Sequence, residues 1–356
     1  MSNPLTIVCS AKMGFGTFEA KFHPLVRLDA VGQVIVLRKE AGPEIPKIRY
    51  VVLPKLCKFP ILNFLITPIL LTWTVWKTKA DLILAYHYIP HFYFAYIASL
   101  FSGRPYILGQ TGSDDQLLAK LPLRGMFLRH ILNKALQLNV PGRNSLEFWE
   151  AIGIRKVRVL HSTIDTDYYV PSAQAKAYDF VYTGRLEDYK GVDLMIEAAN
   201  QLKKSLPDFR FAIVGYGSGR QRYETTVKNY GLENNVFFMG FQSDIRMWLQ
   251  KSRIFIMASD CEGLPCALME AMSCGMVCLT SLVGNIGDLI IEGETGFSFL
   301  PRDKQRMVEL MEQLYHQEPT MQQIKERARA LVVAEHSYSV AQDLWTDALR
   351  GIVNKN

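Results

Sequence analysis

The chain has 356 residues, of which 49% are hydrophobic and 21% are charged. This composition excludes a disordered chain, and the length favours two domains, each with its own core. The net charge of +6 is uneven, because residues 1–164 hold 20 Lys and Arg against 9 Asp and Glu, whereas the remainder holds 20 against 25. We expect the basic first half to meet an anionic partner, such as a phospholipid surface or a phosphorylated acceptor, unless its lysines are merely solvated. Nucleic acid is not an expected partner.

The cysteines show no pattern of a metal site or of paired disulfides. They form no CxxC pair, and most lie in apolar runs. We interpret them as reduced core residues of a cytoplasmic protein. The N-terminus has no charged segment before its short apolar run, so no signal peptide is expected. The six are Cys9, Cys57, Cys261, Cys266, Cys274 and Cys278.

In the first half, short apolar runs alternate with helical segments. Strands are expected at 5–9, 32–38, 48–53, 80–86, 104–109, 136–140 and 157–160. Gly14 and Gly16 follow the first strand and permit a tight turn that a ligand can approach closely. His87 follows the strand at 80–86, and α/β proteins place ligand groups at such strand ends, although a packed or surface histidine is the more ordinary interpretation.

Residues 59–76 form an apolar segment of 18 residues without a charge. Its length is at the lower limit for crossing a bilayer, and Pro60, Asn63 and Pro68 weaken that interpretation. A buried or interfacial helix that leads into the next strand is therefore favoured. Two tryptophans and flanking lysines also leave peripheral membrane contact open. The segment 120–134 is amphipathic and basic, which fits either membrane-surface docking or a solvated helix face.

The second half repeats the alternation, with strands expected at 178–182, 209–219, 235–241, 254–258 and 278–281. Residues 293–299 (GETGFSF) are expected to form a hairpin-like turn. Arg185 and Lys190 directly follow the first of these strands, where they can bring two cations onto a diphosphate. The second segment, 209–219, ends in a glycine turn that contains Gly215 and Gly217. Helices are expected at 191–205 and 304–334, and a last one at 340–353.

The residues from Ser259 to Val277, SDCEGLPCALMEAMSCGMV, carry the strongest functional pattern. We predict a helix from about Pro265 to Ser273, whose free amides after Gly263 are available to a diphosphate. Glu270 is the only charge in this helix and needs a partner, either a Lys or Arg or the hydroxyls of a ribose. Glu262 lies eight residues earlier, so both carboxylates can reach one elongated ligand.

Asp165 and Asp167 form an Asp-x-Asp pattern, in which two carboxylates two residues apart could hold Mg²⁺ between diphosphate oxygens. The alternative is that IDTDYYVPS forms a structural turn.

Several of these segments resemble retaining GT-B glycosyltransferases of family 4, the glycosyl transferases group 1. The similar segments are GRLEDYKG, VGYGSG, the Glu-x7-Glu block and the glycine-rich loop with GETGF. The resemblance implies an α/β fold of two Rossmann-like domains that face a central cleft. Residues 1–168 would bind the acceptor, 169–337 would bind the nucleotide sugar, and a C-terminal helix at about 338–356 would cross back to the first domain.

The resemblance also implies roles for individual residues. Glu262 would contact the donor sugar and Glu270 the ribose, while Arg185 and Lys190 would neutralise the diphosphate. The acceptor side would include His87, Thr111 and Asp114, although Thr111 stands where the family commonly has a histidine. Further donor contacts would come from Gly14, Gly16, Gly215, Gly217, Phe241, Gln242, Gly263, Leu264, Pro265, Cys266 and Ala267.

The implied activity is transfer of a hexosyl group from a UDP- or GDP-sugar to a saccharide or lipid-linked acceptor, with retention, without metal and without other cofactor. We expect a role in cell-envelope polysaccharide, lipopolysaccharide or glycolipid synthesis, in the cytoplasm, with peripheral contact with an anionic membrane at the inner face of the plasma membrane. The alternatives are a nucleotide-sugar epimerase of the same architecture and a non-catalytic nucleotide-sugar-binding subunit.

Overall fold

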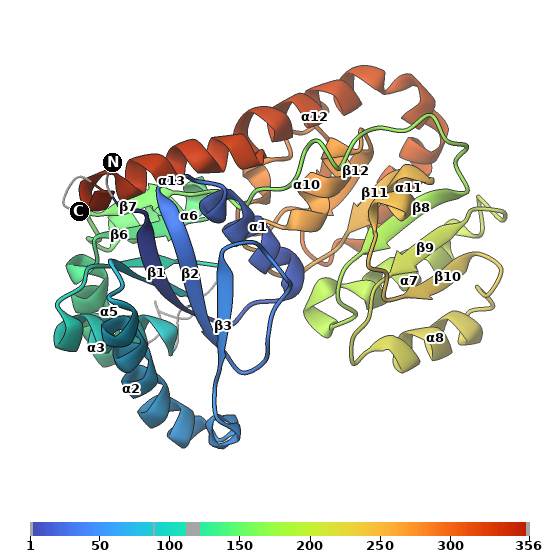
Figure 1. Ribbon diagram of the computed structural model, residues 1–356. Coiled ribbons are helices and arrows are strands. Elements are labelled where there is room, and N and C mark those ends of the chain that lie inside the picture. The colour runs from blue at the N-terminus through green and yellow to red at the C-terminus, as the bar shows by residue number, and fades with distance from the viewer. Residues whose placement is uncertain (1–2, 88–89, 112–121, 354–356) are drawn as a thin grey trace. The chain divides into compact units, whose positions relative to one another are not determined.

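The computed structural model describes residues 3–87, 90–111 and 122–353 (Figure 1). The chain divides into two compact units, Met1–Thr163 with Tyr338–Asn356, and Ile164–Ser337. We call them unit 1 and unit 2. Each is built around one sheet in which every described strand pair is parallel. Parallel pairing requires a crossover between successive strands, which accounts for the helical segments between the apolar runs.

Unit 1 contains a seven-stranded sheet in the order β3-β2-β1-β4-β5-β6-β7. The chain runs outward from β1 to one edge and then returns to fill the other side, so the order reverses beside β1. The carboxyl ends of strands at such a reversal are where open α/β sheets bind ligands. The strands are β1 (Leu5–Ala11), β2 (Val31–Arg38), β3 (Ile48–Val52), β4 (Leu82–Tyr86), β5 (Tyr106–Gly109), β6 (Gln137–Val140) and β7 (Val157–Val159).

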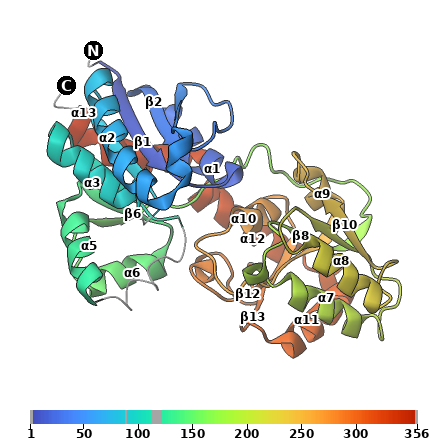
Figure 2. The same cartoon turned by 90° about the horizontal axis from the view of Figure 1, so that it is seen from below.

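Helices cover both faces of the unit 1 sheet (Figure 2). One face packs against α1 (Phe15–Val26) and α13 (Tyr338–Val353), and the other against α2 (Pro60–Thr78), α3 (His91–Ser102), α5 (Pro122–Lys134) and α6 (Arg143–Ala151). Alternating residues of each strand feed the two cores, so Ile7 faces one and Val8 the other. Trp345 and Leu349 of α13 are buried in the same cluster as Phe22 of α1. The last helix therefore completes the core of unit 1.

Unit 2 contains a six-stranded sheet in the order β10-β9-β8-β11-β12-β13. One expectation was wrong here, because residues 297–299 of the supposed hairpin form a strand that pairs in parallel with β12. The strands are β8 (Tyr178–Thr183), β9 (Phe211–Val214), β10 (Val236–Gly240), β11 (Ser252–Met257), β12 (Val277–Ser281) and β13 (Phe297–Phe299).

The unit 2 sheet is also covered on both faces. One face packs against α7 (Val192–Leu202), α8 (Arg220–Asn229) and α11 (Lys304–Gln317), and the other against α9 (Arg246–Gln250), α10 (Cys266–Ser273) and α12 (Gln322–His336). Phe180 and Tyr182 of β8 point to the first face and Val181 to the second. Single 3₁₀ turns occur at η1 (Lys55–Lys58), η2 (Asp188–Lys190), η3 (Ile286–Asp288) and η4 (Glu318–Thr320).

All six cysteines are free, and four of them are buried. Burial raises the pKa of the Cys274 thiol to about 12, with the charge of Glu270 adding to the effect. Such a thiol stays protonated and unreactive at neutral pH.

A buried hydrogen bond joins β1 to α3 in unit 1. Ser10 Oγ lies 2.8 Å from His91 Nδ1. Burial, and then the charges of His87, Lys12 and Lys39, lower the pKa of His91 to about 3 from its ordinary 6.5. The imidazole is therefore neutral at physiological pH.

This depressed pKa predicts a loss of stability in acid. Between about pH 6.5 and pH 3 the unfolded chain binds a proton at residue 91 that the folded chain does not. The unfolding free energy therefore falls as the pH is lowered through this window, by up to about 1.4 kcal/mol per pH unit. The variant His91→Gln keeps a polar side chain that does not titrate. We expect its unfolding free energy to fall less steeply with decreasing pH than that of the wild type. Urea unfolding at about pH 7 and pH 4.5, followed by tryptophan fluorescence, measures both slopes. Equal slopes would show that His91 does not carry the effect.

Candidate functional site

Three loops of unit 2 meet at the carboxyl edge of its sheet, where β8, β9 and β11 end. Leu186 N donates to Tyr216 O at 2.8 Å and Gly219 N to Leu186 O at 2.9 Å, which joins the first two loops. Asp260 N donates to Tyr189 O at 2.8 Å, which joins the first loop to the third. These backbone bonds fix the loops that carry most of the predicted donor residues.

Glycine is required where these loops cross. A Cβ at Gly215, whose φ is +148°, would lie 1.8 Å from Gly184 O. A Cβ at Gly191, whose φ is +66°, would lie 2.0 Å from Ala258 O. Both clashes are with backbone, which cannot move aside as a flexible side chain does. The glycines therefore serve the close packing of the loops against one another.

The predicted residues Lys190 and Glu262 form an ion pair. Lys190 Nζ lies 2.6 Å from Glu262 Oε1, and the side chains are only 16% and 10% exposed. The amine also lies over the ring of Tyr189, 5.2 Å from its centroid. The two charges stabilise each other in a partly dehydrated position where either one alone would be unfavourable.

Arg185 contacts the same tyrosine. Its guanidinium lies 5.5 Å from the ring centroid of Tyr189 and donates a hydrogen bond to the tyrosine hydroxyl. Its backbone carbonyl accepts a hydrogen bond of 2.8 Å from Tyr182 Oη, which fixes the position of this loop. Burial, and then the charge of Glu262, raise the pKa of Tyr182, so this hydroxyl keeps its proton. Arg185 itself is exposed, and both predicted cations thus flank one aromatic ring.

The start of α10 is held by the glycine-rich loop that follows β12. Asn285 donates to Gly263 O from its backbone N at 3.1 Å and from Nδ2 at 3.2 Å. A Cβ at Gly284, whose φ is +58°, would lie 1.9 Å from Glu262 O. The helix begins at Cys266 with no charged side chain in its first turn. No charged side chain of this first turn therefore competes with an anion for the first amides and the positive end of the helix dipole.

Glu270 has a partner that the sequence did not suggest. The expected partner was a Lys, an Arg or a ribose, but the carboxylate interacts with the hydroxyl of Tyr169, far away along the chain. Burial, and then the charge of Glu270 and a hydrogen bond with it, raise the pKa of Tyr169. Glu270 is only partly buried, so its carboxylate remains accessible from solvent.

Two exposed aromatic rings lie near the ends of β9 and β10. Tyr216 and Phe241 pack edge to face with ring centroids 5.6 Å apart, and both are more than half exposed. Gly215 N donates to Gly240 O at 2.8 Å, which holds their loops together. The predicted residue Gln242 donates from Nε2 to Met239 O at 2.9 Å. This pair of rings offers a stacking surface for a flat, aromatic ligand group.

The remaining predicted residues divide between the units. Gly217, Leu264, Pro265 and Ala267 belong to the unit 2 loops and to the start of α10, together with Cys266. Gly14, Gly16, His87 and Thr111 lie in unit 1, and Asp114 lies outside the described residues.

The unit 1 glycines differ from those of unit 2. A Cβ at Gly14 or Gly16 would meet nothing within 4 Å, so the fold itself does not require glycine there. His87 has an unusual φ of +74° for a residue with a side chain, and its ring lies 6.3 Å from that of His91.

The Asp165–Asp167 pair forms a turn. Asp165 Oδ1 accepts from Asp167 N at 3.2 Å and from Tyr168 N at 3.0 Å. This favours the structural-turn interpretation. Within residues 3–87, 90–111 and 122–353, no group of three or more His, Cys, Asp or Glu is arranged to hold a metal ion.

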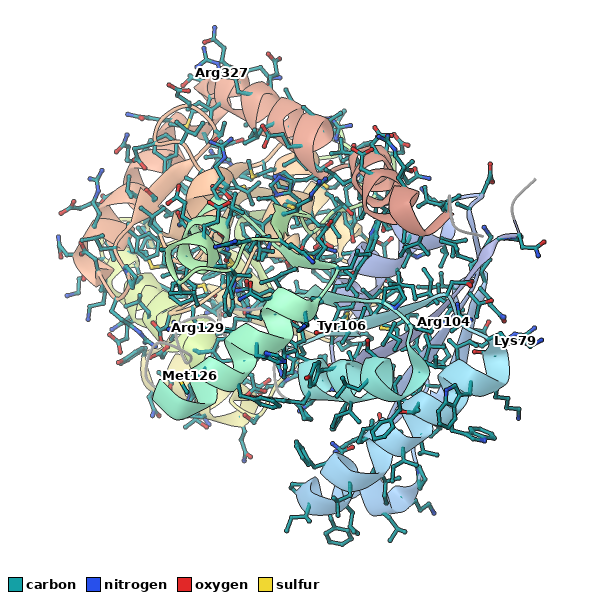
Figure 3. All side chains as sticks on the ribbon, turned by 90° about the vertical axis from the view of Figure 1, so that its left-hand side faces the viewer. Lys79, Arg104, Tyr106, Met126, Arg129 and Arg327 are labelled. Carbon is teal, nitrogen blue, oxygen red and sulfur yellow. The ribbon has the colours of Figure 1, made fainter. Side chains whose placement is uncertain are left out.

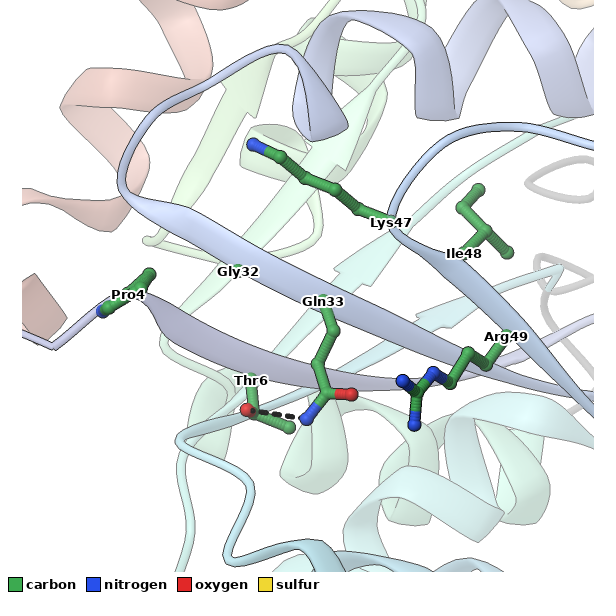
Figure 4. A pocket seen from close by; sticks show the side chains of 7 residues that line it. All are labelled: Pro4, Thr6, Gly32, Gln33, Lys47, Ile48 and Arg49. Carbon is green, nitrogen blue, oxygen red and sulfur yellow. Dashed lines mark hydrogen bonds between the residues drawn. The ribbon is translucent and has the colours of Figure 1, made fainter.

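A pocket of about 490 Å³ lies in unit 1, at the edge of the sheet where β1, β2 and β3 begin (Figure 4). Gln33 Nε2 donates to Thr6 Oγ1 across its floor at 3.1 Å. None of the predicted site residues lines it. The lining residues are Pro4, Thr6, Gly32, Gln33, Lys47, Ile48 and Arg49.

Several groups at the unit 2 edge are not among the residues predicted from the sequence. Tyr189 lies between the two predicted cations, and Tyr216, an aromatic residue between two glycines, carried a signal that could have been used. Thr183 Oγ1 and Ser259 Oγ are buried at the ends of β8 and β11 and have no hydrogen-bond partner within the described part of the chain. Buried hydroxyls of this kind can bind a ligand.

A comparison with protein families assigns this unit. The family described as Glycosyl transferases group 1 matches residues 170–331. Unit 2 is a glycosyl transferases group 1 domain. The match covers the loops after β8, β9 and β11 and the whole of α10, so the resemblance of those segments to glycosyl transferases group 1 is confirmed.

Several curated relatives match part of the chain. The putative colanic acid biosynthesis glycosyltransferase WcaL of Escherichia coli is 31% identical over 40% of this chain and 38% of its own length. The amylovoran biosynthesis glycosyltransferase AmsK of Erwinia amylovora is 32% identical over 44% and 40%. The N-acetyl-alpha-D-glucosaminyl L-malate synthase of Bacillus anthracis is 24% identical over 77% and 76%. The chain thus spans less than half the length of the first two relatives.

Solved structures match the whole chain. Anabaena HepE in complex with UDP superposes with a TM-score of 0.79 and 18% identity, over 98% of this chain and 100% of that one. The apo lipopolysaccharide outer core galactosyltransferase WaaB superposes with a TM-score of 0.72 and 15% identity, over 98% and 99%. At this identity the likeness concerns the fold, and it confirms the predicted GT-B class of two Rossmann-like units.

The Lys190–Glu262 pair yields a stability prediction. Lys190→Ala and Glu262→Ala should each lower the unfolding free energy by about 2 kcal/mol, because each leaves one charge unpaired in a mostly buried position. The double variant should be less destabilised than the sum of the two. Urea unfolding of all four proteins in a double-mutant cycle measures the coupling. Additive effects would mean that the pair is not formed in solution.

Proposed function

We propose that the protein is a glycosyltransferase that moves a hexosyl group from a UDP- or GDP-linked sugar to a saccharide or lipid-linked acceptor. The observation that carries this proposal is the convergence, in a glycosyl transferases group 1 domain, of two cations, two carboxylates and a helix N-terminus at one sheet edge. An ion pair alone is common in proteins. Its position beside the start of α10 makes it useful for a ligand that carries both phosphates and sugar hydroxyls.

Each part of the donor has a chemically matched group. The diphosphate meets Arg185, Lys190 and the first amides of α10, which supply positive charge and N–H donors. The ribose hydroxyls meet Glu270, oriented by Tyr169. The base stacks against the ring of Phe241, and the sugar hydroxyls meet Glu262.

The proposed chemistry needs no metal and no further cofactor. As the sugar departs, the nucleoside diphosphate gains negative charge, and cations fixed beforehand stabilise that change more than they stabilise the bound donor. The site residues include no carboxylate with an assigned role as nucleophile. We therefore propose departure and attack on the same face of the sugar, with retention of configuration.

Unit 1 is the proposed acceptor-binding unit, with His87, Thr111 and Asp114 on the acceptor side. Its charge of +11 (20 − 9, residues 1–164) suits an anionic acceptor. Names of relatives such as WcaL and AmsK support a role in envelope polysaccharide synthesis. We place the protein in the cytoplasm, in peripheral contact with the inner face of the plasma membrane.

Two alternative functions differ from glycosyl transfer because neither of them uses an acceptor. An epimerase would convert its nucleotide sugar without any acceptor, and a non-catalytic subunit would bind the nucleotide without turnover. The presence together of Arg185, Lys190, Glu262 and Glu270 favours transfer over mere binding.

The first test is binding of the nucleotide. UDP or GDP at about a hundred times its dissociation constant should stabilise the protein by about 2.7 kcal/mol, which raises the melting temperature by a few degrees. Thermal-shift titrations with UDP, GDP and ADP on wild type and Glu270→Ala measure this. We expect one nucleotide to shift the wild type and to lose its effect in the variant. No shift with any nucleotide would contradict the proposed site.

The second test is turnover. Glu262→Gln and Lys190→Ala should each lower the rate of nucleotide release from the donor at least about a hundredfold, because each removes a charge aimed at the transition state. Lys304→Ala is the control for loss of a lysine ion pair outside the site, since Lys304 pairs with Glu197 of a neighbouring helix at 3.0 Å, although this pair is more exposed than Lys190–Glu262. Its rate should be unchanged. Near-normal rates in both site variants would refute the assigned roles.

A further inference from the structure

The helix α2 presents an apolar face to solvent. Five exposed apolar side chains of this 19-residue helix follow one another at intervals of four residues and finally three, so they lie along one side of it. They are Ile61, Leu65, Ile69, Trp73 and Trp76. Each is more than half exposed. We call this stripe the α2 face. A surface helix of a soluble domain ordinarily turns polar residues outward, so α2 is the reverse of the expected pattern.

The opposite side of α2 shows that this orientation is fixed. Leu71 and Val75 are buried in the core cluster beneath the sheet, together with residues of α3. Three threonines lie on this buried side as well. Thr72 Oγ1 donates to Pro68 O at 2.8 Å and Thr74 Oγ1 to Leu70 O at 2.7 Å, so these hydroxyls need no other partner. The helix therefore buries threonines and exposes tryptophans, and the exposed residues cannot turn inward without removing Leu71 and Val75 from the core.

Basic residues frame the α2 face. Lys55 and Lys58 precede the helix, and Lys77 and Lys79 lie at its other end, all of them exposed. Between Glu44 and Asp81 the chain has no acidic residue. Lys77 Nζ lies over the ring of Trp73, 4.6 Å from its centroid. An aliphatic stripe with tryptophans and lysines at its end is the composition of a helix that lies in a membrane interface.

Neighbouring helices extend the apolar surface. The helices α2 and α5 lie on either side of α3, and the views in Figures 2 and 3 agree on this order. Figure 3 shows Met126 and Arg129 on α5 and Lys79 at the end of α2. Met126, Phe127, Leu100 and Phe101 are at least half exposed. Apolar and cationic side chains thus occur together on this side of unit 1.

We propose that the α2 face is a membrane-binding surface that inserts its aliphatic and tryptophan side chains among anionic phospholipids, with α2 parallel to the bilayer plane. This inference deepens the membrane location within the proposed function. By length and composition α2 could also cross a bilayer, but a third of the relevant segment is buried within unit 1. Lying in the interface keeps that side in the core and buries the other in lipid.

A second copy of the chain is a poorer partner for this surface. A two-fold contact through the α2 face would bring the same basic ends together, with no acidic residue in the segment to balance them. Anionic headgroups supply the missing negative charge along the whole face.

The test is co-sedimentation of the full chain with lipid vesicles. We expect binding to phosphatidylcholine vesicles that contain about 30% phosphatidylglycerol, and much weaker binding to phosphatidylcholine alone. Replacing Lys77 and Lys79 by Gln should weaken binding to the anionic vesicles about fivefold per lysine. Ile69→Gln should weaken it roughly tenfold through lost insertion.

The control is Leu300→Gln in unit 2, because Ile69 and Leu300 are 68% and 67% exposed. Both variants should keep the wild-type melting temperature, and Leu300→Gln should keep full vesicle binding. Absence of binding to anionic vesicles, or equal binding by the two variants, would overturn the proposal. So would a wild-type dimer in sedimentation velocity that Ile69→Gln converts to monomer, since the face would then join two copies.

The vesicle assay contains no nucleotide, and the nucleotide titration contains no lipid. Failure of this inference would therefore leave the proposed donor site intact, and failure of the donor site would leave the membrane surface intact.

Discussion

Close contact between backbones at the carboxyl edge of the unit 2 sheet is the constraint on which the site depends. The loops after β8, β9, β11 and β12 approach one another there with no room for a Cβ at Gly215, Gly191 or Gly284. In the same place Asp260 N bonds to Tyr189 O, and Lys190, the next residue, pairs with Glu262, two residues after Asp260. The chemistry of the charged residues thus rests on residues that have no side chain.

Much of this arrangement was predictable from the sequence, because its signals are local. The strand ends, the helix of α10 and the candidate residues after Gly263 follow from short patterns of apolar, glycine and proline residues. The pairings were not predictable in the same way. Lys190 and Glu262 are 72 residues apart, and the strands β8 to β11 lie between Tyr169 and Glu270 in the sequence. Local spacing contains no information on contacts of that range.

Two other features show the limits of pattern alone. The strand β13 has three residues, too few to distinguish it from the arm of a hairpin. The segment of α2 was recognisable as apolar, yet its periodicity does not say which side faces the core. The side with threonines is buried because their hydroxyls can bond to carbonyls four residues back, an outcome that hydropathy does not register.

The placement of α13 has a consequence for how the protein is made. Its residues Trp345, Leu349 and Ile352 belong to the core of unit 1, whereas all of unit 2 lies between them and the rest of that core in the chain. On the ribosome, unit 2 can fold as soon as its own continuous segment has emerged. Unit 1 is synthesised first but must wait, with one face of its sheet incompletely covered, until the final helix arrives.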